Sequence, residues 1–178
     1  GDRVLEVGAG CGTLTWMLLQ RGANVTAVEI DEDTAEFLRW MFPEDRVEVR
    51  HGDVLEMSPN SLLGTFEGWY AVANLPYQVA TEVYFYLADE FDRFERLVLM
   101  FQREVAERMV AQVGEDAYGA LSLQAQLFAE LNIVQTLPGG AFKPPPKVSS
   151  AALRVDPIRG TRISDPTNRE MFRRVVKQ

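Results

Sequence analysis

The sequence predicts an α/β fold with a mostly parallel, seven-stranded twisted sheet flanked by helices. Two observations carry this prediction. Short apolar runs alternate with stretches of helical periodicity, and the 178 residues are enough to bury a core. Repeated β-α-β alternation places helices on both faces of such a sheet, joined by right-handed crossovers.

The elements follow one another along the whole chain. The expected strands are residues 3–7, 24–29, 47–50, 69–73, 96–101, 132–137 and 151–155, which are short and apolar. The expected helices are residues 13–21, 33–41, 81–90, 103–112 and 121–129. Asp33 is the expected N-cap of the second helix, and Pro43 ends that helix.

Composition restricts the setting in which the protein works. No apolar run approaches the roughly 20 residues that span a bilayer, so we expect no membrane partner. Cys11 is the only cysteine, which excludes a disulfide framework and favours a reducing, cytoplasmic setting. Because His51 is the only histidine, a His-based metal site lacks a second ligand, and we expect no bound metal.

Charge is distributed unevenly along the chain, whose net charge is −8. Residues 1–90 hold 5 Lys+Arg and 16 Asp+Glu, whereas residues 91–178 hold 13 and 10. Residues 137–178 hold 9 basic and 3 acidic side chains. This asymmetry indicates that the C-terminal part faces a polyanion, although a solvated tail of mixed charge is an equal alternative.

Flexible or polar residues follow the first four expected strands, at the sheet edge where open α/β folds bind ligands. A glycine turn at residues 8–12 follows the first strand, although such a turn also occurs without a ligand. Glu29 ends the second strand, 23 residues after Glu6, where nucleoside cofactors find a ribose-hydroxyl acceptor. Asp53 follows the third strand and offers an acceptor to an adenine amino group, although Gly-Asp is also a common turn.

The acidic character of this edge selects among nucleoside cofactors. Glu29 is followed by Asp31, Glu32 and Asp33, which would repel a cofactor phosphate. A phosphate-free, cationic nucleoside such as S-adenosylmethionine therefore fits better than a dinucleotide. For residues 31–33 themselves, helix capping and dipole complementation is the preferred interpretation.

The tetrapeptide Asn74-Leu75-Pro76-Tyr77 follows the expected strand at residues 69–73. The Asn74 side-chain oxygen and a backbone carbonyl of Leu75 or Pro76 suit the two N–H groups of an aromatic amine. These contacts would direct the nitrogen lone pair at a methyl donor by positioning and electrostatics alone. Tyr77 would stack on the base, at about 1–3 kcal/mol. An X-Pro turn with an ordinary buried tyrosine is the alternative.

These motifs resemble those of the small-subunit ribosomal RNA adenine N6,N6-dimethyltransferases, a family of Rossmann-like class I S-adenosylmethionine-dependent methyltransferases. The resemblance covers nearly the whole chain and includes residues 4–15, 27–31, 52–53, 74–77, 102–108, 118–122 and 142–150. The most specific match is the proline-rich segment Phe142-Lys143-Pro144-Pro145-Pro146-Lys147-Val148-Ser149-Ser150.

The resemblance implies a site and a reaction. The implied contacts of S-adenosyl-L-methionine are Gly8, Gly10, Glu29, Ile30, Asp53, Val54 and Asn74. The implied adenine-holding residues are Asn74, Leu75, Pro76 and Tyr77, with Phe142 closing the other face of the unstacked base. Members of the family methylate the N6 amines of two adjacent adenines in a 3′-terminal hairpin of small-subunit ribosomal RNA, during ribosome assembly. The expected partner is the pre-ribosomal small subunit, and the expected enzyme is monomeric and cytoplasmic.

The resemblance also implies that the chain consists of two parts. Residues 1–156 match the catalytic domain without its N-terminal segment, and residues 157–178 match a linker and the start of a small helical C-terminal domain. Three alternatives stay open. One is a large-subunit rRNA adenine methyltransferase of the antibiotic-resistance type, which usually carries Ile in place of Leu75. The others are a non-catalytic RNA-binding assembly factor and a small-molecule methyltransferase.

Overall fold

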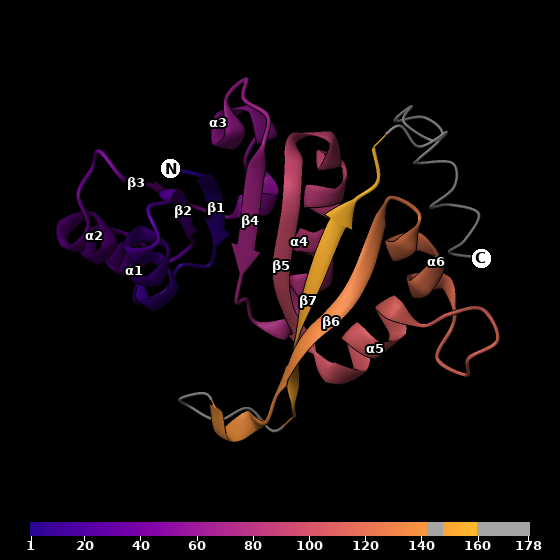
Figure 1. The fold of residues 1–178 in the computed structure, drawn as a ribbon. Coiled ribbons are helices and arrows are strands. Elements are labelled where there is room, and N and C mark those ends of the chain that lie inside the picture. The colour runs from indigo at the N-terminus through magenta and orange to yellow at the C-terminus, as the bar shows by residue number, and fades with distance from the viewer. Residues whose placement is uncertain (142–147, 160–178) are drawn as a thin grey trace.

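The computed structural model describes residues 1–141 and 148–159, and these form one sheet covered by helices (Figure 1). The strands are β1 (Arg3–Val7), β2 (Asn24–Glu29), β3 (Val47–His51), β4 (Trp69–Ala73), β5 (Phe94–Gln102), β6 (Ala129–Leu137) and β7 (Ser150–Pro157). The helices are α1 (Thr13–Gln20), α2 (Glu32–Met41), α3 (Pro59–Leu63), α4 (Tyr77–Ala88), α5 (Arg103–Val110) and α6 (Ala120–Gln126). Short 3₁₀ helices lie at Val54–Glu56, Phe91–Arg93 and Gly139–Ala141.

The seven strands are ordered β3-β2-β1-β4-β5-β7-β6. Strands β1 to β5 pair in parallel, whereas β7 is antiparallel to both of its neighbours, β5 and β6. In Figure 1 the β7 arrow points opposite to that of β4. The order reverses at β1, which has β2 on one side and β4 on the other, and ligands bind at such switch points. The predicted mostly parallel, seven-stranded sheet is confirmed.

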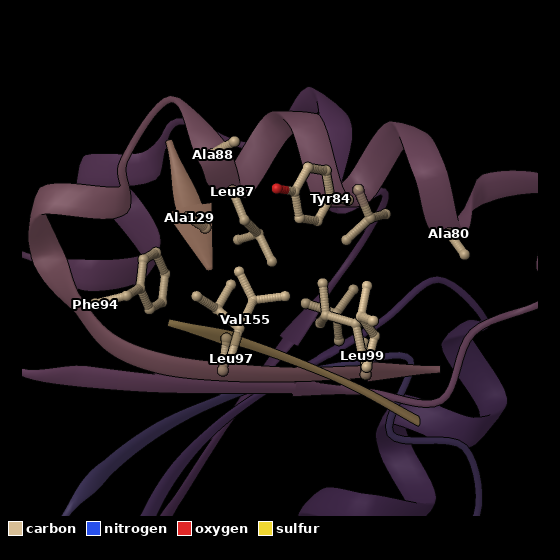
Figure 2. Close-up of a cluster of buried hydrophobic side chains, with 14 of the residues drawn as sticks. Ala80, Tyr84, Leu87, Ala88, Phe94, Leu97, Leu99, Ala129 and Val155 are labelled. Atoms are coloured by element: carbon tan, nitrogen blue, oxygen red, sulfur yellow. The ribbon is translucent and has the colours of Figure 1, made fainter. Parts of the chain in front are cut away.

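Both faces of the sheet are buried along β1 and β2, whereas β5 and β7 alternate between buried residues and residues that are exposed or half-buried. Along β1, Val4 packs into one apolar cluster, and Leu5 and Val7 pack into another. Leu38 of α2 belongs to the first cluster. Figure 2 shows the second cluster, where Tyr84 of α4 and its neighbours point towards β5. The Tyr84 hydroxyl donates a hydrogen bond to the Ala125 carbonyl at 2.7 Å, so its polar atom is satisfied within the core.

The start of α2 differs from the prediction. Asp31, and not Asp33, is the N-cap: its Oδ1 accepts hydrogen bonds from the Thr34 N–H at 2.8 Å and the Thr34 hydroxyl at 2.6 Å. These bonds hold the pKa of Asp31 below its usual range. The predicted cap was therefore wrong, and Asp33 stands in the first turn, where its charge complements the helix dipole. The helix ends at Met41, before Pro43, as predicted.

The start of α4 also differs from the prediction, and here the difference bears on the site. We expected the helix at residue 81, but it begins at Tyr77, with Pro76 at its N-cap. A proline is tolerated there because the first helical turn needs no N–H at this position. Tyr77 thus belongs to a helix and not to a loop. Helix α3, only five residues long, was not predicted at all.

Two expectations lie wholly or largely outside the described residues. Phe142 is one, and the predicted C-terminal unit, of which only residues 157–159 are described, is the other. Across the described part of the chain, no helix combines the length and apolar character that crossing a bilayer requires.

Truncating the core should destabilise the fold. Leu97 of β5 is fully buried, so Leu97→Ala leaves a cavity and should lower the free energy of unfolding by about 2–5 kcal/mol. Urea titration followed by circular dichroism measures this change. The control is Val113→Ala, because Val113 is 82% exposed and its truncation should change the free energy by less than about 0.5 kcal/mol. Equal effects of both substitutions would contradict the described core.

Candidate active site

A pocket of about 410 Å³ opens at the carboxyl ends of the central strands. Its lining residues are Val7, Gly8, Gly10, Val28, Glu29, Ile30, Gly52, Asp53, Val54, Leu55, Asn74, Leu75, Pro76, Val79 and Val83. All the predicted cofactor contacts are among them, together with Leu75 and Pro76 of the tetrapeptide. Tyr77 is not among these lining residues.

The glycine turn gives the pocket its floor. Gly8 and Gly10 both have positive φ, +73° and +54°, which side-chain-bearing residues rarely adopt. A Cβ on Gly8 would lie 2.7 Å from Cδ2 of Leu75, so the turn packs directly against the tetrapeptide. A Cβ on Gly10 would meet no atom within 4 Å, which leaves the backbone open to a ligand on the pocket side.

The Glu29 carboxylate ties this turn to the end of β2. Its Oε2 accepts a hydrogen bond from the Gly10 N–H at 2.8 Å, and its Oε1 accepts one from the Asp31 N–H at 3.1 Å. Each carboxylate oxygen can accept two hydrogen bonds, and each accepts one here, so both keep capacity for a ligand hydroxyl. The sequence predicted the position of Glu29 but not these two backbone partners.

A second carboxylate, that of Glu6, is buried on β1 and is not among the lining residues. The Thr15 hydroxyl of α1 donates a hydrogen bond to its Oε2 at 2.7 Å. Burial raises the pKa of Glu6 from 4.5 to about 7, with a smaller contribution from the charge of Glu29, while the Thr15 hydrogen bonds oppose the rise. Glu6 therefore links β1 to α1 beneath the glycine turn and carries less negative charge than an exposed glutamate near neutral pH.

The third strand contributes Asp53, which lies two residues beyond β3. Its Oδ1 accepts a hydrogen bond from the Leu55 N–H at 2.9 Å and begins the 3₁₀ helix Val54–Glu56. Asp53 and Glu29 are the charged side chains among the lining residues, and both are acidic. The rest of the lining is largely apolar, so the described pocket suits a flat ligand that is neutral or cationic and disfavours a phosphate.

The tetrapeptide lies where β4 ends and α4 begins. Asn74 is exposed, and Leu75 is half-buried against Gly8. The Tyr77 hydroxyl forms a 2.6 Å hydrogen bond with the hydroxyl of Ser150, the first residue of β7. Ser150 is completely buried, and sequence reasoning did not select it, although it ends the proline-rich segment.

Six lining residues were not among the predicted site residues: Val7, Val28, Gly52, Leu55, Val79 and Val83. Two of them, Val79 and Val83, lie on the same helix. They stand one turn apart on α4 and give the pocket an apolar wall. The predicted helix began at residue 81, which left Val79 in a loop. Val79 and Val83 are four residues apart. With the helix starting at Tyr77, this spacing is the signal that would have placed both on one face.

Two solved structures with a similar fold are named as transferases that act on adenosine or rRNA. A dimethyladenosine transferase from Plasmodium falciparum is 33% identical and superposes with a TM-score of 0.75, covering 89% of this chain and 56% of that one. The 23S rRNA methyltransferase ErmE is 26% identical with a TM-score of 0.75, covering 99% of this chain and 69% of that one. The fold is that of a class I S-adenosylmethionine-dependent methyltransferase.

Comparison of sequences narrows the class to one family. The profile of the family described as Ribosomal RNA adenine dimethylase matches residues 1–178, and the chain belongs to this family. "Ribosomal RNA small subunit methyltransferase A" of Geobacter metallireducens is 43% identical over 180 residues, which are 99% of this chain and 65% of the relative. The protein of the same name from Syntrophotalea carbinolica is 43% identical and is covered to 66%. The chain thus spans about two thirds of the length of these relatives.

The raised pKa of Glu6 predicts a specific dependence of stability on pH. The folded state holds the Glu6 proton up to about pH 7, whereas the unfolded state loses it near pH 4.5. Between these values the folded state binds more protons, so the contribution of Glu6 to stability falls as pH rises from about 4.5 to about 7. Glu6→Gln stays neutral and keeps an acceptor for Thr15, so it should lack this fall, which is on the order of 3 kcal/mol.

Urea unfolding of both proteins between pH 5 and 8 measures this difference. We expect the variant to gain stability relative to the parent as pH rises. Parallel curves for the two proteins would show that Glu6 titrates normally.

Proposed function

We propose that this chain is the catalytic part of an enzyme that methylates adenine N6 amines of small-subunit ribosomal RNA with S-adenosylmethionine as the methyl donor. The observation that carries the proposal is the position of Asn74-Leu75-Pro76. These residues line the same pocket as the carboxylates of Glu29 and Asp53, so an amine-binding edge and an acidic nucleoside pocket adjoin. Family membership supports the reaction class.

The residues present fit S-adenosylmethionine. The open backbone at Gly10 gives room for close approach, and the hydrogen-bonded carboxylate of Glu29 suits the two ribose hydroxyls. Asp53 suits the adenine amino group, and Ile30 and Val54 offer apolar surface to the adenine ring. S-adenosylmethionine, when bound, supplies an electrophilic methyl group on a cationic sulfur. The acidic lining favours that positive charge.

The chain's own residues then act on the target amine. In the proposed complex the Asn74 side-chain oxygen and a backbone carbonyl of Leu75 or Pro76 accept the two N–H bonds of the exocyclic amine. Both acceptors favour a pyramidal nitrogen, whose lone pair is localised and better able to attack. The nitrogen–carbon bond would form as the carbon–sulfur bond of the donor breaks, with its electron pair leaving on sulfur, and the N–H proton of the resulting cationic amine would pass to solvent. Tyr77 and Phe142 are proposed to hold the two faces of a base that has left its stack. This proposed chemistry needs no titrating side chain at the reacting atom.

The choice of RNA rests on the relatives. Those bearing a small-subunit name are 43% identical, whereas the 23S rRNA methyltransferase ErmE is 26% identical. Leu75 also departs from the Asn-Ile-Pro-Tyr form usual in the antibiotic-resistance type. We therefore propose the pre-ribosomal small subunit as the substrate and two adjacent adenines as the targets, in the cytoplasm.

The direct test is transfer of tritiated methyl groups from S-adenosylmethionine to precursor small subunits, with primer extension to map the modified bases. We expect label in two adjacent adenines of the small-subunit RNA. Label in large-subunit RNA alone would establish the alternative target. Tight binding of S-adenosylmethionine without any transfer would point to a non-catalytic role.

Substitution of Asn74 should separate catalysis from folding. Asn74→Ala removes a proposed acceptor for the amine, and the rate of methyl transfer should fall by about 10²–10³-fold. Because Asn74 is exposed, the urea midpoint should stay unchanged. The control is Asn132→Ala, since Asn132 lies on β6 and away from the pocket lining. Full activity of Asn74→Ala would contradict the proposed role.

A further inference from the structure

The hydrogen bond between Tyr77 and Ser150 joins parts of the chain that are 73 residues apart. Tyr77 begins α4, directly after the proposed amine-binding residues, and Ser150 is both the last residue of the proline-rich segment and the first residue of β7. The 2.6 Å distance between the two oxygens indicates a strong contact between hydroxyl groups. This bond connects the start of α4 with the end of the proline-rich segment, and these two segments are proposed to hold opposite faces of the target base.

Ser150 is held more rigidly than a loop residue would be. It is completely buried, and it pairs in register with Gln102 of β5 on one side and Leu137 of β6 on the other. The preceding residue is fixed as well, because the Ser149 carbonyl accepts a hydrogen bond from the Arg103 N–H at 2.9 Å. The Tyr77 hydroxyl is therefore anchored to the interior of the sheet.

We propose that Ser150 is a positioning residue, whose hydroxyl fixes the orientation of the Tyr77 ring against which the target adenine stacks. This inference rests on the proposed function. Rotation of the Tyr77 ring about its side-chain bonds would tilt the stacked base and move its amine away from the acceptors at Asn74. A ring that is held at its hydroxyl oxygen as well as at its backbone has lost this rotational freedom before the base binds. The entropy cost of ordering the ring on binding is therefore lower.

The same bond assigns a limited chemical role to the Tyr77 hydroxyl. It is engaged with a side chain inside the sheet, so the part of Tyr77 that remains for a base is its aromatic ring. This agrees with a reaction driven by positioning and not by proton transfer from a phenol. It also predicts that the hydroxyls of Tyr77 and Ser150 act as one unit.

The chain offers matched controls for both positions. Tyr84 stands on the same helix as Tyr77 and also uses its hydroxyl in a hydrogen bond, to the Ala125 carbonyl at 2.7 Å. Ser122, like Ser150, is completely buried, and its hydroxyl donates to the Arg108 carbonyl at 2.5 Å. The Ser122 hydroxyl also accepts a hydrogen bond from the Gly119 N–H at 3.1 Å. Tyr84→Phe and Ser122→Ala therefore remove buried hydroxyl hydrogen bonds at two residues that are not among the pocket lining.

The experiment compares Ser150→Ala, Tyr77→Phe and their double variant with these two controls, in the full-length protein. Steady-state methyl transfer to precursor small subunits gives kcat and KM, and calorimetry gives the Kd of S-adenosylmethionine. We expect kcat to fall about tenfold for Ser150→Ala, the size of one hydrogen bond, with the Kd unchanged within about twofold. Tyr77→Phe should lose a similar amount, and the double variant should lose no more than either single variant.

The controls separate positioning from general stability. Tyr84→Phe and Ser122→Ala should lower the urea midpoint at least as much as the site variants do, yet leave kcat within about twofold of the parent. If Ser150→Ala and Ser122→Ala have the same kcat, or if the losses at Tyr77 and Ser150 add, the positioning role is wrong. Failure of the proposed function is distinct, because the parent protein itself would then transfer no methyl group.

Discussion

The cofactor half of the candidate site depends on the Glu29 carboxylate more than on any other side chain. Its two oxygens accept the N–H groups of Gly10 and Asp31, which belong to the turns after β1 and β2. Backbone hydrogen bonds from the Gly8 and Ala9 N–H groups to the Val28 carbonyl join the same turn to β2. The Glu29 carboxylate adds to these bonds and keeps acceptor capacity for a ligand. This double use explains why a carboxylate, and not an amide, suits the end of β2.

The proposed base-binding half of the site depends on a different constraint, the antiparallel insertion of β7 between β5 and β6. This insertion brings Ser150 from the C-terminal part of the chain to the edge where β4 ends. Tyr77 is then tied to a buried strand by a hydroxyl contact. The two halves meet where Leu75 packs against Gly8. A shift of the glycine turn would therefore displace the tetrapeptide as well.

Most of the fold was predictable, because buried parallel strands appear in the sequence as short apolar runs. The bounds of β1, β2 and β4 agree with the prediction. The starts of α2 and α4 were predicted wrongly. For α2, two residues competed for the cap. Asp31 and Asp33 both have cap-forming side chains, and only the bonds to Thr34 distinguish them. The predicted strand ends also indicated that Glu29, Asp53 and Asn74 lie at one edge of the sheet, and all three line the same pocket. The hydrogen bond between Tyr77 and Ser150 could not be predicted from the local sequence, because it depends on the insertion of β7 between β5 and β6.

The charges of the site also bear on how strongly the donor and the product of the proposed reaction would bind. Glu29 and Asp53 give the described lining two acidic side chains, while burial raises the pKa of the nearby Glu6. In the proposed reaction the methyl donor is cationic at sulfur, and the sulfur of the spent donor is neutral. The two carboxylates therefore attract the donor more strongly than its product. Glu6 is partly protonated near neutral pH, so this preference would arise mainly from Glu29 and Asp53, which line the pocket. Backbone N–H groups hold both carboxylates in position.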